Sequence, residues 1–431
     1  MEDLKKYGII PIFILIVISN IFAHVYWPMY YGKDVIINGY IDSKFDHVKR
    51  AFENNFLKGM EREGANVAVF YKGQNVVNLY GGIKNNSNNE EWDHKTKTVI
   101  FSATKAISSV CIALLVDRNY IKYDDKVIKV WPEYGQYGKE NTTIEHVLTH
   151  MAGIPYLEKE ISFEVGSNEE ELARMIESSK PLWPPGYTSG YHGLTFGWIV
   201  NEIVKRTDPK KRSLHKFFKD EISNPNNLDI DIGCKKESLH HIAKISQPTI
   251  IEIIKDTLIQ PLMIPMFGIA FLQPNGSPIV KMQENPSWMK MTLNNIPFND
   301  PKILSIPNGA ITGITNSYNL GKLFNLFISG KIVSNRTLSQ ITGPTLTNWH
   351  LERTTLWPVY KGRGFFWDVN PIDSSKFIFG HPGYGCQGLH IDLENELVVS
   401  YLTNGLKSST SILCVPYQSI LKAVYKSINN I

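Results

Sequence analysis

Two kinds of hydrophobic spacing mark the front of the chain. Over residues 42–62 the large apolar side chains recur near every third or fourth position, the period of one helix face. Residues 66–71 and 75–80 are instead short runs rich in β-branched and aromatic residues, separated by Lys72-Gly73-Gln74. This pattern predicts a helix followed by a β-hairpin, because a short link containing Gly is typical of hairpins.

The next hydrophobic segment, residues 98–117, changes period partway. Residues 98–101 are β-rich, and the residues after them place apolar side chains at helical spacing. The apolar stripe consists of Ile107, Val110, Cys111, Leu114 and Leu115. We therefore expect a short extended run that leads into a buried helix.

The middle and the end of the chain differ in the elements they predict. Residues 156–304 carry mainly helical patterns, and the polar tract 208–238 is expected to be an exposed loop. The last third turns β-rich after a helix over residues 316–329 and closes with a helix over residues 415–428. Its predicted strands are residues 364–369, 376–379, 388–392 and 396–402.

Strands at both ends of the chain, separated by a helical stretch, favour an α+β fold. One antiparallel sheet flanked by helices would take strands from residues 42–155 and 305–431, and residues 156–304 would be an inserted, mainly helical part. Residue 102 would then lie where the two parts meet, which is where pockets commonly form.

An apolar segment precedes this body. Residues 7–32 contain no Asp, Glu, Lys or Arg, and a bilayer span needs about 20 residues. Tyr26, Trp27, Tyr30 and Tyr31 would form an interfacial aromatic belt.

We therefore predict a single-pass membrane anchor over residues 1–32, with residues 7–28 in contact with the lipid bilayer. Lys5 and Lys6 favour a lumenal or extracellular body. A cleaved signal peptide ending near residues 21–23 is the alternative. Four sequons fit a glycoprotein, at Asn85, Asn141, Asn275 and Asn335.

Composition excludes some classes of protein. The chain has 431 residues, a hydrophobic fraction of 43% and a net charge of +4 without long basic runs, so nothing indicates a nucleic-acid partner. Four separated cysteines argue against a zinc ribbon and a disulfide scaffold, and Cys386 is interpreted as a lone buried thiol. Glu145, His146 and His150 share a predicted helix but lack the His-Glu-x-x-His order, so we expect no metal.

Ser102 and Lys105, at the start of the predicted buried helix, are a candidate nucleophile and its base. Residues three apart share a helix face, so the Lys amine can take the proton when the Ser hydroxyl attacks a carbonyl. The helix N-terminus adds N–H groups where an oxyanion would form. The same Ser-x-x-Lys motif also occurs at residues 213–216, 287–290 and 419–422. By itself the motif is therefore also compatible with an ordinary amphipathic helix that has a serine in its first turn.

Five segments, in this order along the chain, support a catalytic role for the Ser-x-x-Lys motif at residue 102. They are Phe101-Ser-Ala-Thr-Lys105, residues 143–153, Pro185-Gly186 with Tyr191-His-Gly193, residues 309–313, and Gly380-His-Pro-Gly383. Over residues 42–425 the chain resembles the serine β-lactamase and penicillin-binding-protein-like family. It is most similar to the class C-like branch, which includes family VIII esterases and animal β-lactamase-like proteins.

The resemblance implies a role for each matching residue. Ser102 would be the acylated nucleophile, Lys105 would help to deprotonate it, and Tyr191 would be the general base and acid, with a pKa lowered by nearby cations. His381 would replace the family's Lys as a donor to a substrate carboxylate or to Tyr191. In the segment that contains Gly383, the backbone N–H of Tyr384 would complete the oxyanion hole with that of Ser102.

Two departures from the family pattern shape the functional prediction. Gly193 stands where the family has Asn, and His381 removes a permanent positive charge, so efficient β-lactam hydrolysis is not expected. We expect a serine hydrolase that forms an acyl-enzyme with a small-molecule or peptide ester or amide and needs no cofactor. A catalytically weak binding or scaffolding module and a D-amino-acid peptidase or transpeptidase remain alternatives, and self-association is left open.

Overall fold

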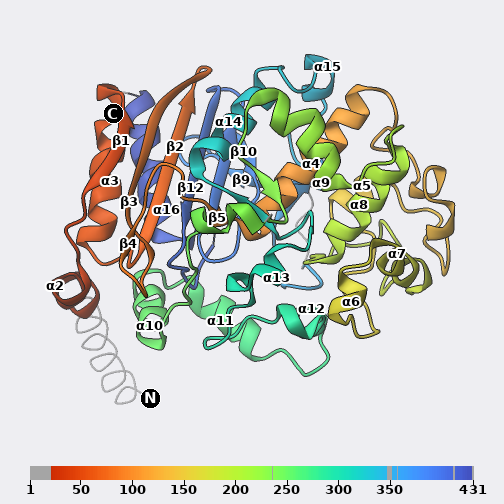
Figure 1. Cartoon of the computed structure of the whole chain (residues 1–431), viewed down its shortest axis with the longest axis horizontal. Coiled ribbons are helices and arrows are strands. Elements are labelled where there is room, and N and C mark those ends of the chain that lie inside the picture. Colours follow the sequence, from red (N-terminus) through yellow and green to blue (C-terminus); the bar gives the residue numbers. More distant parts are fainter. Residues whose placement is uncertain (1–20, 235, 347–351, 357, 411–412, 430–431) are drawn as a thin grey trace, which may run out of the picture.

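The computed structural model describes residues 21–429, apart from residue 235, residues 347–351, residue 357 and residues 411–412. A large antiparallel sheet occupies one side of the molecule, and a mainly helical region occupies the other (Figure 1). The strand order is β1-β3-β2-β12-β11-β10-β9-β8, with β4 paired to β3. The predicted antiparallel sheet with flanking helices is therefore confirmed.

Strands from both chain ends meet at the centre of this sheet. β2 pairs with β12, and Val69 lies opposite Val399 in the register. The strands of the large sheet are β1 (Ile37–Ile41), β2 (Gly64–Tyr71), β3 (Gln74–Asn85), β4 (Glu90–Glu91), β8 (Tyr360–Gly362), β9 (Phe365–Val369), β10 (Phe377–Gly380), β11 (Gly388–Asp392) and β12 (Leu397–Thr403). A small second sheet has the order β5-β7-β6, from β5 (Thr98–Val99), β7 (Gly313–Thr315) and β6 (Asp231–Ile232).

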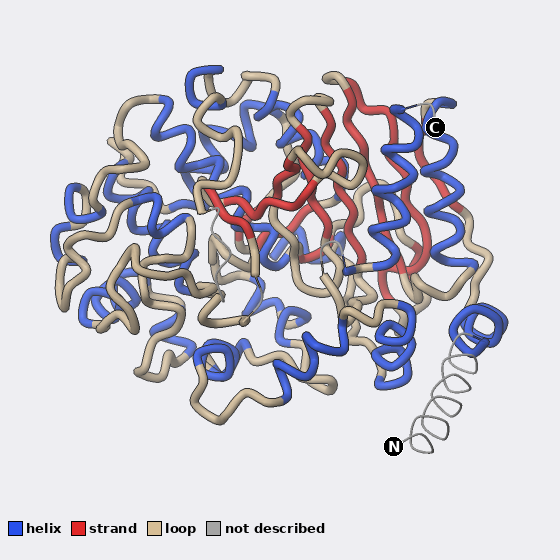
Figure 2. The backbone as a smooth tube through the Cα atoms, turned by 180° about the vertical axis from the view of Figure 1, so that it is seen from behind, coloured by secondary structure: helices blue, strands red, loops and turns tan. Residues whose placement is uncertain are grey.

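Helices cover the two faces of the large sheet, as the view from behind also shows (Figure 2). α3 (Asp46–Leu57) and α16 (Val415–Asn429) pack on one face around Phe52, Val69 and Tyr401. α4 (Thr104–Asp117) and α14 (Ser317–Ile328) belong to the core of the other face, which extends into the helical region. Every residue of α4 from Thr104 to Val116 is buried, so the predicted buried helix is confirmed.

Residues 156–304 contain most of the remaining helices. These are α6 (Phe163–Gly166), α7 (Glu169–Ser178), α8 (Thr195–Thr207), α9 (Leu214–Phe218), α10 (Ile250–Ile259), α11 (Met263–Phe271), α12 (Pro278–Glu284) and α13 (Pro301–Leu304). α5 (Ile144–Leu148) precedes this region and α15 (Asn335–Leu338) follows it. β6 also lies within residues 156–304 but pairs with β7, which ties that region to the small sheet.

The expectation of an exposed loop over residues 208–238 is wrong. α9 and the π-helical turn η6 (Lys219–Ser223) occupy part of it, and Leu214, Phe217 and Ile222 are buried. The spacing of these apolar residues is helical. The surrounding Lys, Asp and Asn residues make the tract polar on average, so its composition indicated a loop.

The predicted membrane anchor falls largely on residues 1–20, which lie outside the described residues. Its described remainder forms the turn η1 (Phe22–Tyr26) and α2 (Trp27–Tyr31). Trp27 is buried and its indole N–H donates to the carbonyl of Gly59 at 2.9 Å, so this residue does not belong to an aromatic belt. Within the part of the chain that the structure describes, no helix has the length and apolar character to cross a bilayer.

Candidate active site

Ser102 lies in the tight turn that connects the small sheet to α4. The residue before it, Phe101, has a left-handed backbone with φ 47°, which a bulky residue adopts only where its surroundings enforce it. The Thr104 hydroxyl donates to the carbonyl of Phe101 at 2.6 Å and accepts from the N–H of Gly313 at 2.8 Å. These two contacts fix the turn that presents Ser102 and link it to β7.

Lys105 is fully buried next to Ser102. Its Nζ donates to the carbonyl oxygens of Gly193 at 2.8 Å and Ala310 at 3.2 Å, and lies 3.4 Å from Oγ of Ser102. Burial lowers the pKa of Lys105 well below its usual range, and no described carboxylate pairs with it. A neutral amine has two N–H groups for the two carbonyls and one lone pair for the Ser102 hydroxyl, which is what a general base requires.

Tyr191 approaches the same serine from the segment before α8. Its hydroxyl donates to Oγ of Ser102 at 2.6 Å, and its ring centroid lies 4.7 Å from Nζ of Lys105. Burial raises the pKa of Tyr191, so the expectation that nearby cations lower it is wrong for the free protein. The physical reason is that Lys105, the cation expected there, is itself desolvated and favours its neutral form.

A buried ion pair that the sequence did not indicate holds the Tyr191 segment. Nζ of Lys361, on β8, donates to Oγ of Ser189 at 2.8 Å and pairs with Glu352 at 3.5 Å. Both side chains of this pair are only 1% exposed. A lone Lys in a three-residue strand gives no signal of such a role.

His192 follows Tyr191 and has a structural arrangement. Its Nε2 accepts from the N–H of Ile154 at 3.0 Å, and its Nδ1 donates to the carbonyl of Gly190 at 2.6 Å. Both ring nitrogens are therefore occupied by the backbone, away from Ser102.

At Gly193 the backbone contacts Lys105 in place of the missing amide side chain. The Gly193 carbonyl accepts a hydrogen bond from Nζ of Lys105. A Cβ added at this position would lie 2.5 Å from Sδ of Met282, on α12. The space next to Gly193 is thus filled by a flexible apolar side chain from the helical region.

Gly383 and Tyr384 lie on the other side of Ser102. A Cβ on Gly383 would lie 2.2 Å from the carbonyl oxygen of Ile100, so only glycine permits this approach to the turn. Tyr384 packs its ring against Phe101 with centroids 5.7 Å apart. The segment that carries the predicted oxyanion donor therefore contacts the Ser102 turn directly.

His381 follows β10 and is buried beside Phe366, with ring centroids 4.3 Å apart. Its Nδ1 contacts the carbonyl of Pro382 at 2.9 Å, and its Nε2 has no partner among the described residues. Burial, together with the nearby Lys105, lowers the pKa of His381 well below its usual range. In the neutral ring Nδ1 is the donor, so Nε2 is an acceptor and not the donor that the resemblance implies.

Cys386 is paired, which corrects the interpretation as a lone thiol. It forms a disulfide with Cys414, which lies 28 residues further along the chain at the start of α16. The partner was not apparent from the sequence because a pair this far apart has no motif. The other two cysteines, Cys111 and Cys234, are buried.

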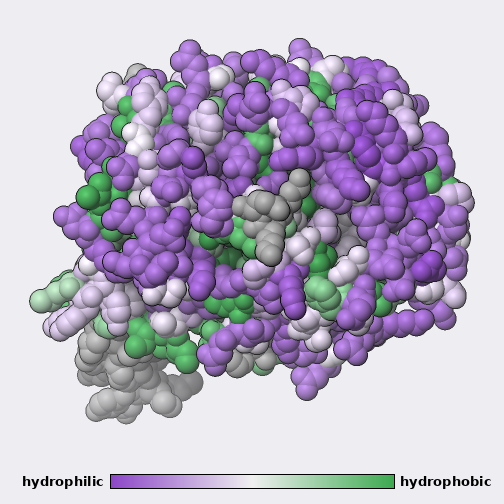
Figure 3. Space-filling model, viewed as in Figure 1, coloured by the Kyte–Doolittle hydropathy of each residue, from purple (hydrophilic) through white to green (hydrophobic). Residues whose placement is uncertain are grey.

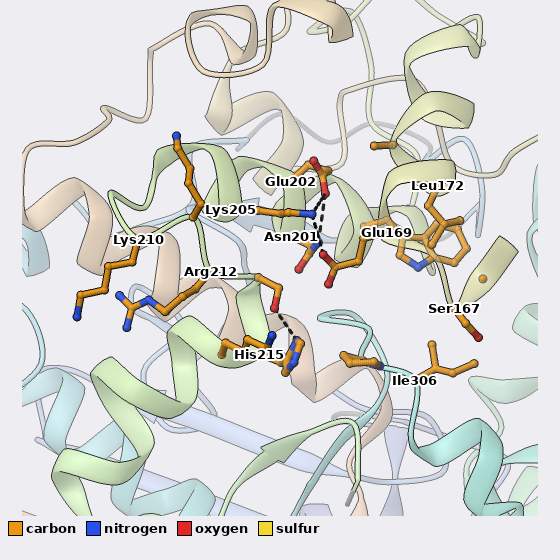
Figure 4. A pocket seen from close by; sticks show the side chains of 17 residues that line it. Ser167, Glu169, Leu172, Asn201, Glu202, Lys205, Lys210, Arg212, His215 and Ile306 are labelled. Atoms are coloured by element: carbon orange, nitrogen blue, oxygen red, sulfur yellow. Dashed lines mark hydrogen bonds and ion pairs between the residues drawn. The ribbon is translucent and has the colours of Figure 1, made fainter. Parts of the chain in front are cut away.

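A separate cavity of about 580 Å³ lies against another face of α8 (Figure 4). Trp198, Asn201, Glu202 and Lys205 of α8 line it, and Lys205 pairs with Glu169 at 3.0 Å. Ser102, Lys105 and Tyr191 do not line this cavity. Within the described residues, no group of His, Cys, Asp and Glu side chains has the arrangement of a metal site.

A serine, a lysine and a tyrosine that meet beside an antiparallel sheet are typical of the β-lactamase-like class of proteins. The chain belongs to the β-lactamase family, whose model, described as "Beta-lactamase", matches residues 52–413. Among curated proteins, "Esterase/beta-lactamase LipL" of Mycobacterium tuberculosis is 31% identical over 198 residues, which cover 45% of this chain and 43% of that protein.

Solved structures share the fold over most of the chain. "Crystal structure of a family VIII carboxylesterase" has a TM-score of 0.77 and 21% identity, over 91% of this chain and all of that one. A penicillin-binding-protein homologue from Caulobacter crescentus has a TM-score of 0.74 and 23% identity, with 91% of this chain and 100% of that one covered. EstA from Arthrobacter nitroguajacolicus has a TM-score of 0.74 and 20% identity, over 91% of this chain and 98% of that one.

Proposed function

We propose that this protein is a serine hydrolase that cleaves carboxylic esters through an acyl-enzyme on Ser102. The observation that carries the proposal is the convergence of two groups on one oxygen. Oγ of Ser102 lies 2.6 Å from the hydroxyl of Tyr191 and 3.4 Å from the amine of Lys105. The membership in the β-lactamase family and the relative named as an esterase support it.

In this proposal the lone pair of Lys105 takes the proton of Ser102 as Oγ attacks the ester carbonyl carbon. The N–H groups of Ser102 and Tyr384 stabilise the oxyanion. When the C–O bond breaks, the Tyr191 hydroxyl protonates the leaving alkoxide, and the Lys105 ammonium formed in the first step, which lies beside the Tyr191 ring, returns that proton to the Tyr191 oxygen. Water then attacks the acyl-enzyme by the reverse proton path and releases the acid and the free serine.

The environment of His381 favours an ester over an anionic substrate. A buried neutral imidazole with an acceptor nitrogen offers no charge for the carboxylate of a β-lactam or of a peptide that ends in D-Ala. A neutral ester needs no such charge, and once Tyr191 has protonated the leaving alkoxide, the product alcohol has a hydroxyl that can donate to that acceptor.

Covalent labelling with a fluorophosphonate probe tests the nucleophile. We expect the wild-type protein to be labelled and Ser102→Ala to lose labelling. Ser419→Ala is the matched control, because Ser419 begins another Ser-x-x-Lys motif, on α16, and its hydroxyl bonds to Asn55 of α3 and to Pro416 of its own helix. If the wild-type protein remains unlabelled, or if Ser102→Ala is labelled equally, the hydrolase proposal fails.

A substrate panel then tests the specificity. We expect hydrolysis of p-nitrophenyl acyl esters and no release of D-Ala from a peptide that ends in D-Ala-D-Ala. The opposite result would identify a peptidase.

We also propose that residues 7–28 anchor the protein to a membrane and that its body is lumenal or extracellular. The Cys386–Cys414 disulfide supports this placement, because disulfides persist in oxidising compartments. Asn141 and Asn335 of the sequons are exposed. A gel shift on treatment with a peptide N-glycosidase and N-terminal sequencing of the mature protein test the proposal; an unglycosylated protein in the cytosolic fraction contradicts it.

A further inference from the structure

α10 and α11 expose apolar side chains that a helix in water normally buries. Ile254 on α10 is 51% exposed, and Leu262, between the two helices, is 58% exposed. The other exposed apolar side chains of this stretch are Ile250, Ile251, Leu258, Ile264 and Leu272. Figure 3 shows hydrophobic side chains gathered over α10, at the lower left of the molecule. We call this set of seven residues the apolar face.

The charged residues of α10 point the other way. Lys255 is only 2% exposed, pairs with Asp256 at 2.6 Å and lies 5.1 Å from the ring of Trp27. Glu252 pairs with Arg62 at 3.2 Å. α10 thus turns its charged side chains inward and its apolar side chains outward. A helix on the surface of a protein in water does the opposite.

The sequence beyond α10 continues the same character. Residues 257–280 contain no Asp, Glu, Lys, Arg or His, although this stretch includes all of α11 and two connecting segments. A patch on a monomer in water seldom exceeds a few hundred Å² of contiguous apolar surface. The rim of a protein–protein interface is polar, whereas no charged residue interrupts this stretch.

The apolar face lies next to the start of the described chain. α10 contacts η1, Lys255 of α10 lies over the ring of Trp27 on α2, and Figure 1 shows α10 and α2 as neighbours at the lower left. Val25, Met29 and Tyr30 of this first segment are exposed as well. In the sequence, residues 7–20, which precede this first segment, contain no Asp, Glu, Lys or Arg.

We infer that the apolar face is a lipid-binding surface that inserts into the interfacial region of a bilayer. Helices of this kind lie in the membrane plane with their apolar side chains about 5–10 Å below the headgroups. This contact is separate from the anchor proposed for residues 7–28, because it involves side chains more than 200 residues away in the sequence.

The same segment borders the site of Ser102 at both ends. Gln247, just before α10, accepts a hydrogen bond from the hydroxyl of Tyr384 at 3.2 Å. Met282, on α12 just after α11, fills the space beside Gly193. A bilayer in contact with the apolar face would therefore lie close to the rim of the site.

Depth-dependent fluorescence quenching tests the inference on the full chain. Ile254→Cys and Leu262→Cys are labelled with a nitrobenzoxadiazole dye and mixed with phosphatidylcholine vesicles that carry a doxyl quencher on the acyl chain. Leu182→Cys and Ile372→Cys are the matched controls, because both residues are exposed apolar positions outside the apolar face. Cys111 and Cys234 lie outside the disulfide but are buried, so they do not compete for the dye.

We expect about twofold quenching at positions 254 and 262 and almost none at the two controls. The measurement does not depend on Ser102 chemistry, so it is distinguishable from a failure of the hydrolase proposal. If vesicles bind the protein while the dye at positions 254 and 262 stays accessible to aqueous iodide, only the N-terminal segment contacts lipid and the inference is overturned. If the dye is shielded without vesicles in a concentration-dependent way, the apolar face is an interface between two copies, which also overturns it.

Discussion

Two buried clusters in this protein use the same functional groups for different purposes. One joins Lys105, Tyr191 and the hydroxyl of Ser102. The other joins Lys407, Tyr401 and the hydroxyl of Thr403, but around the carboxylate of Glu61, with Lys407 2.7 Å and Thr403 3.0 Å from it. The two clusters differ in one group: the second contains the carboxylate of Glu61, and the first has no carboxylate among the described residues that pairs with its lysine.

That carboxylate decides what the lysine can do. Burial lowers the pKa of Lys407, and the charge of Glu61 opposes the shift and favours the ammonium form. For Lys105 burial acts alone, because its partners are two carbonyl oxygens. We therefore expect the Glu61 cluster to be a stabilising tie between β12 and the end of α3, and the Ser102 cluster to hold a reactive neutral amine. The variants below test this distinction.

The largest effect is expected for Lys105→Met. Methionine keeps the length and the burial but removes the basic amine, so the rate of acyl-enzyme formation should fall about 10³- to 10⁴-fold, or about 4–5.5 kcal/mol in activation free energy. Single-turnover kinetics with a p-nitrophenyl ester measures it. A fall of less than about tenfold would assign the base to another group.

Lys407→Met should act on stability instead. It leaves the buried carboxylate of Glu61 without its cation, which costs about 3–5 kcal/mol of unfolding free energy. Denaturant unfolding measures the loss, and the double variant Glu61→Gln with Lys407→Met should recover most of it because the uncompensated charge is gone. A double variant as unstable as Lys407→Met would contradict the ionic explanation.

The two tyrosines provide a third contrast. Tyr191→Phe removes the hydroxyl that contacts Ser102, and we expect kcat to fall about 10²-fold. Tyr401→Phe removes a donor to Glu61, and should lower the unfolding free energy by about 1–3 kcal/mol while kcat is retained. Equal losses of kcat in both variants would mean that the phenol at position 191 has no chemical role.

The pH dependence distinguishes the clusters further. Acylation should rise as the pH rises through the lowered pKa of Lys105 and then level off, since only the neutral amine is a base. Unfolded Lys105 keeps its proton to a higher pH than folded Lys105, so stability also rises with pH between the two pKa values.

In Lys105→Met this contribution to the pH dependence of stability disappears, and the unfolding free energy at pH 7 should increase by about 1–2 kcal/mol. Thermal melts across pH measure it. A variant that is less stable than wild type at pH 7 would show that Lys105 is charged in the folded protein.

The smallest effect is expected for an exposed lysine with a partner. Lys129 pairs with Asp125 at 2.9 Å and its side chain is 57% exposed. Lys129→Met should change the unfolding free energy by less than about 0.5 kcal/mol and leave catalysis unchanged. It serves as the control for all the lysine variants.

Much of the architecture follows from local patterns. Runs rich in β-branched and aromatic residues predicted β2 and the last four long strands to within a residue or two, whereas β3 extends five residues beyond its predicted run. The helical patterns predicted α14 and α16 equally closely, and they predicted α3 with bounds four or five residues too wide at each end. The spacing of Ser102, Lys105 and Tyr191 in family motifs indicated which residues to bring together.

Other features depend on contacts between distant segments. The pairing of Cys386 with Cys414 and of Lys361 with Glu352 has no local signature. The left-handed backbone of Phe101 and the filling of the space at Gly193 by Met282 likewise arise from neighbours far away in the chain.

By itself, the sequence determined the antiparallel sheet with its flanking helices, the family and the residues to examine, because periodicity and motifs are local properties. Only the tertiary structure decided the pKa values of the site. Burial lowers the pKa of Lys105 and of His381 and raises that of Tyr191, because desolvation disfavours the charged form of each group. That environment is assembled from segments that no local pattern connects.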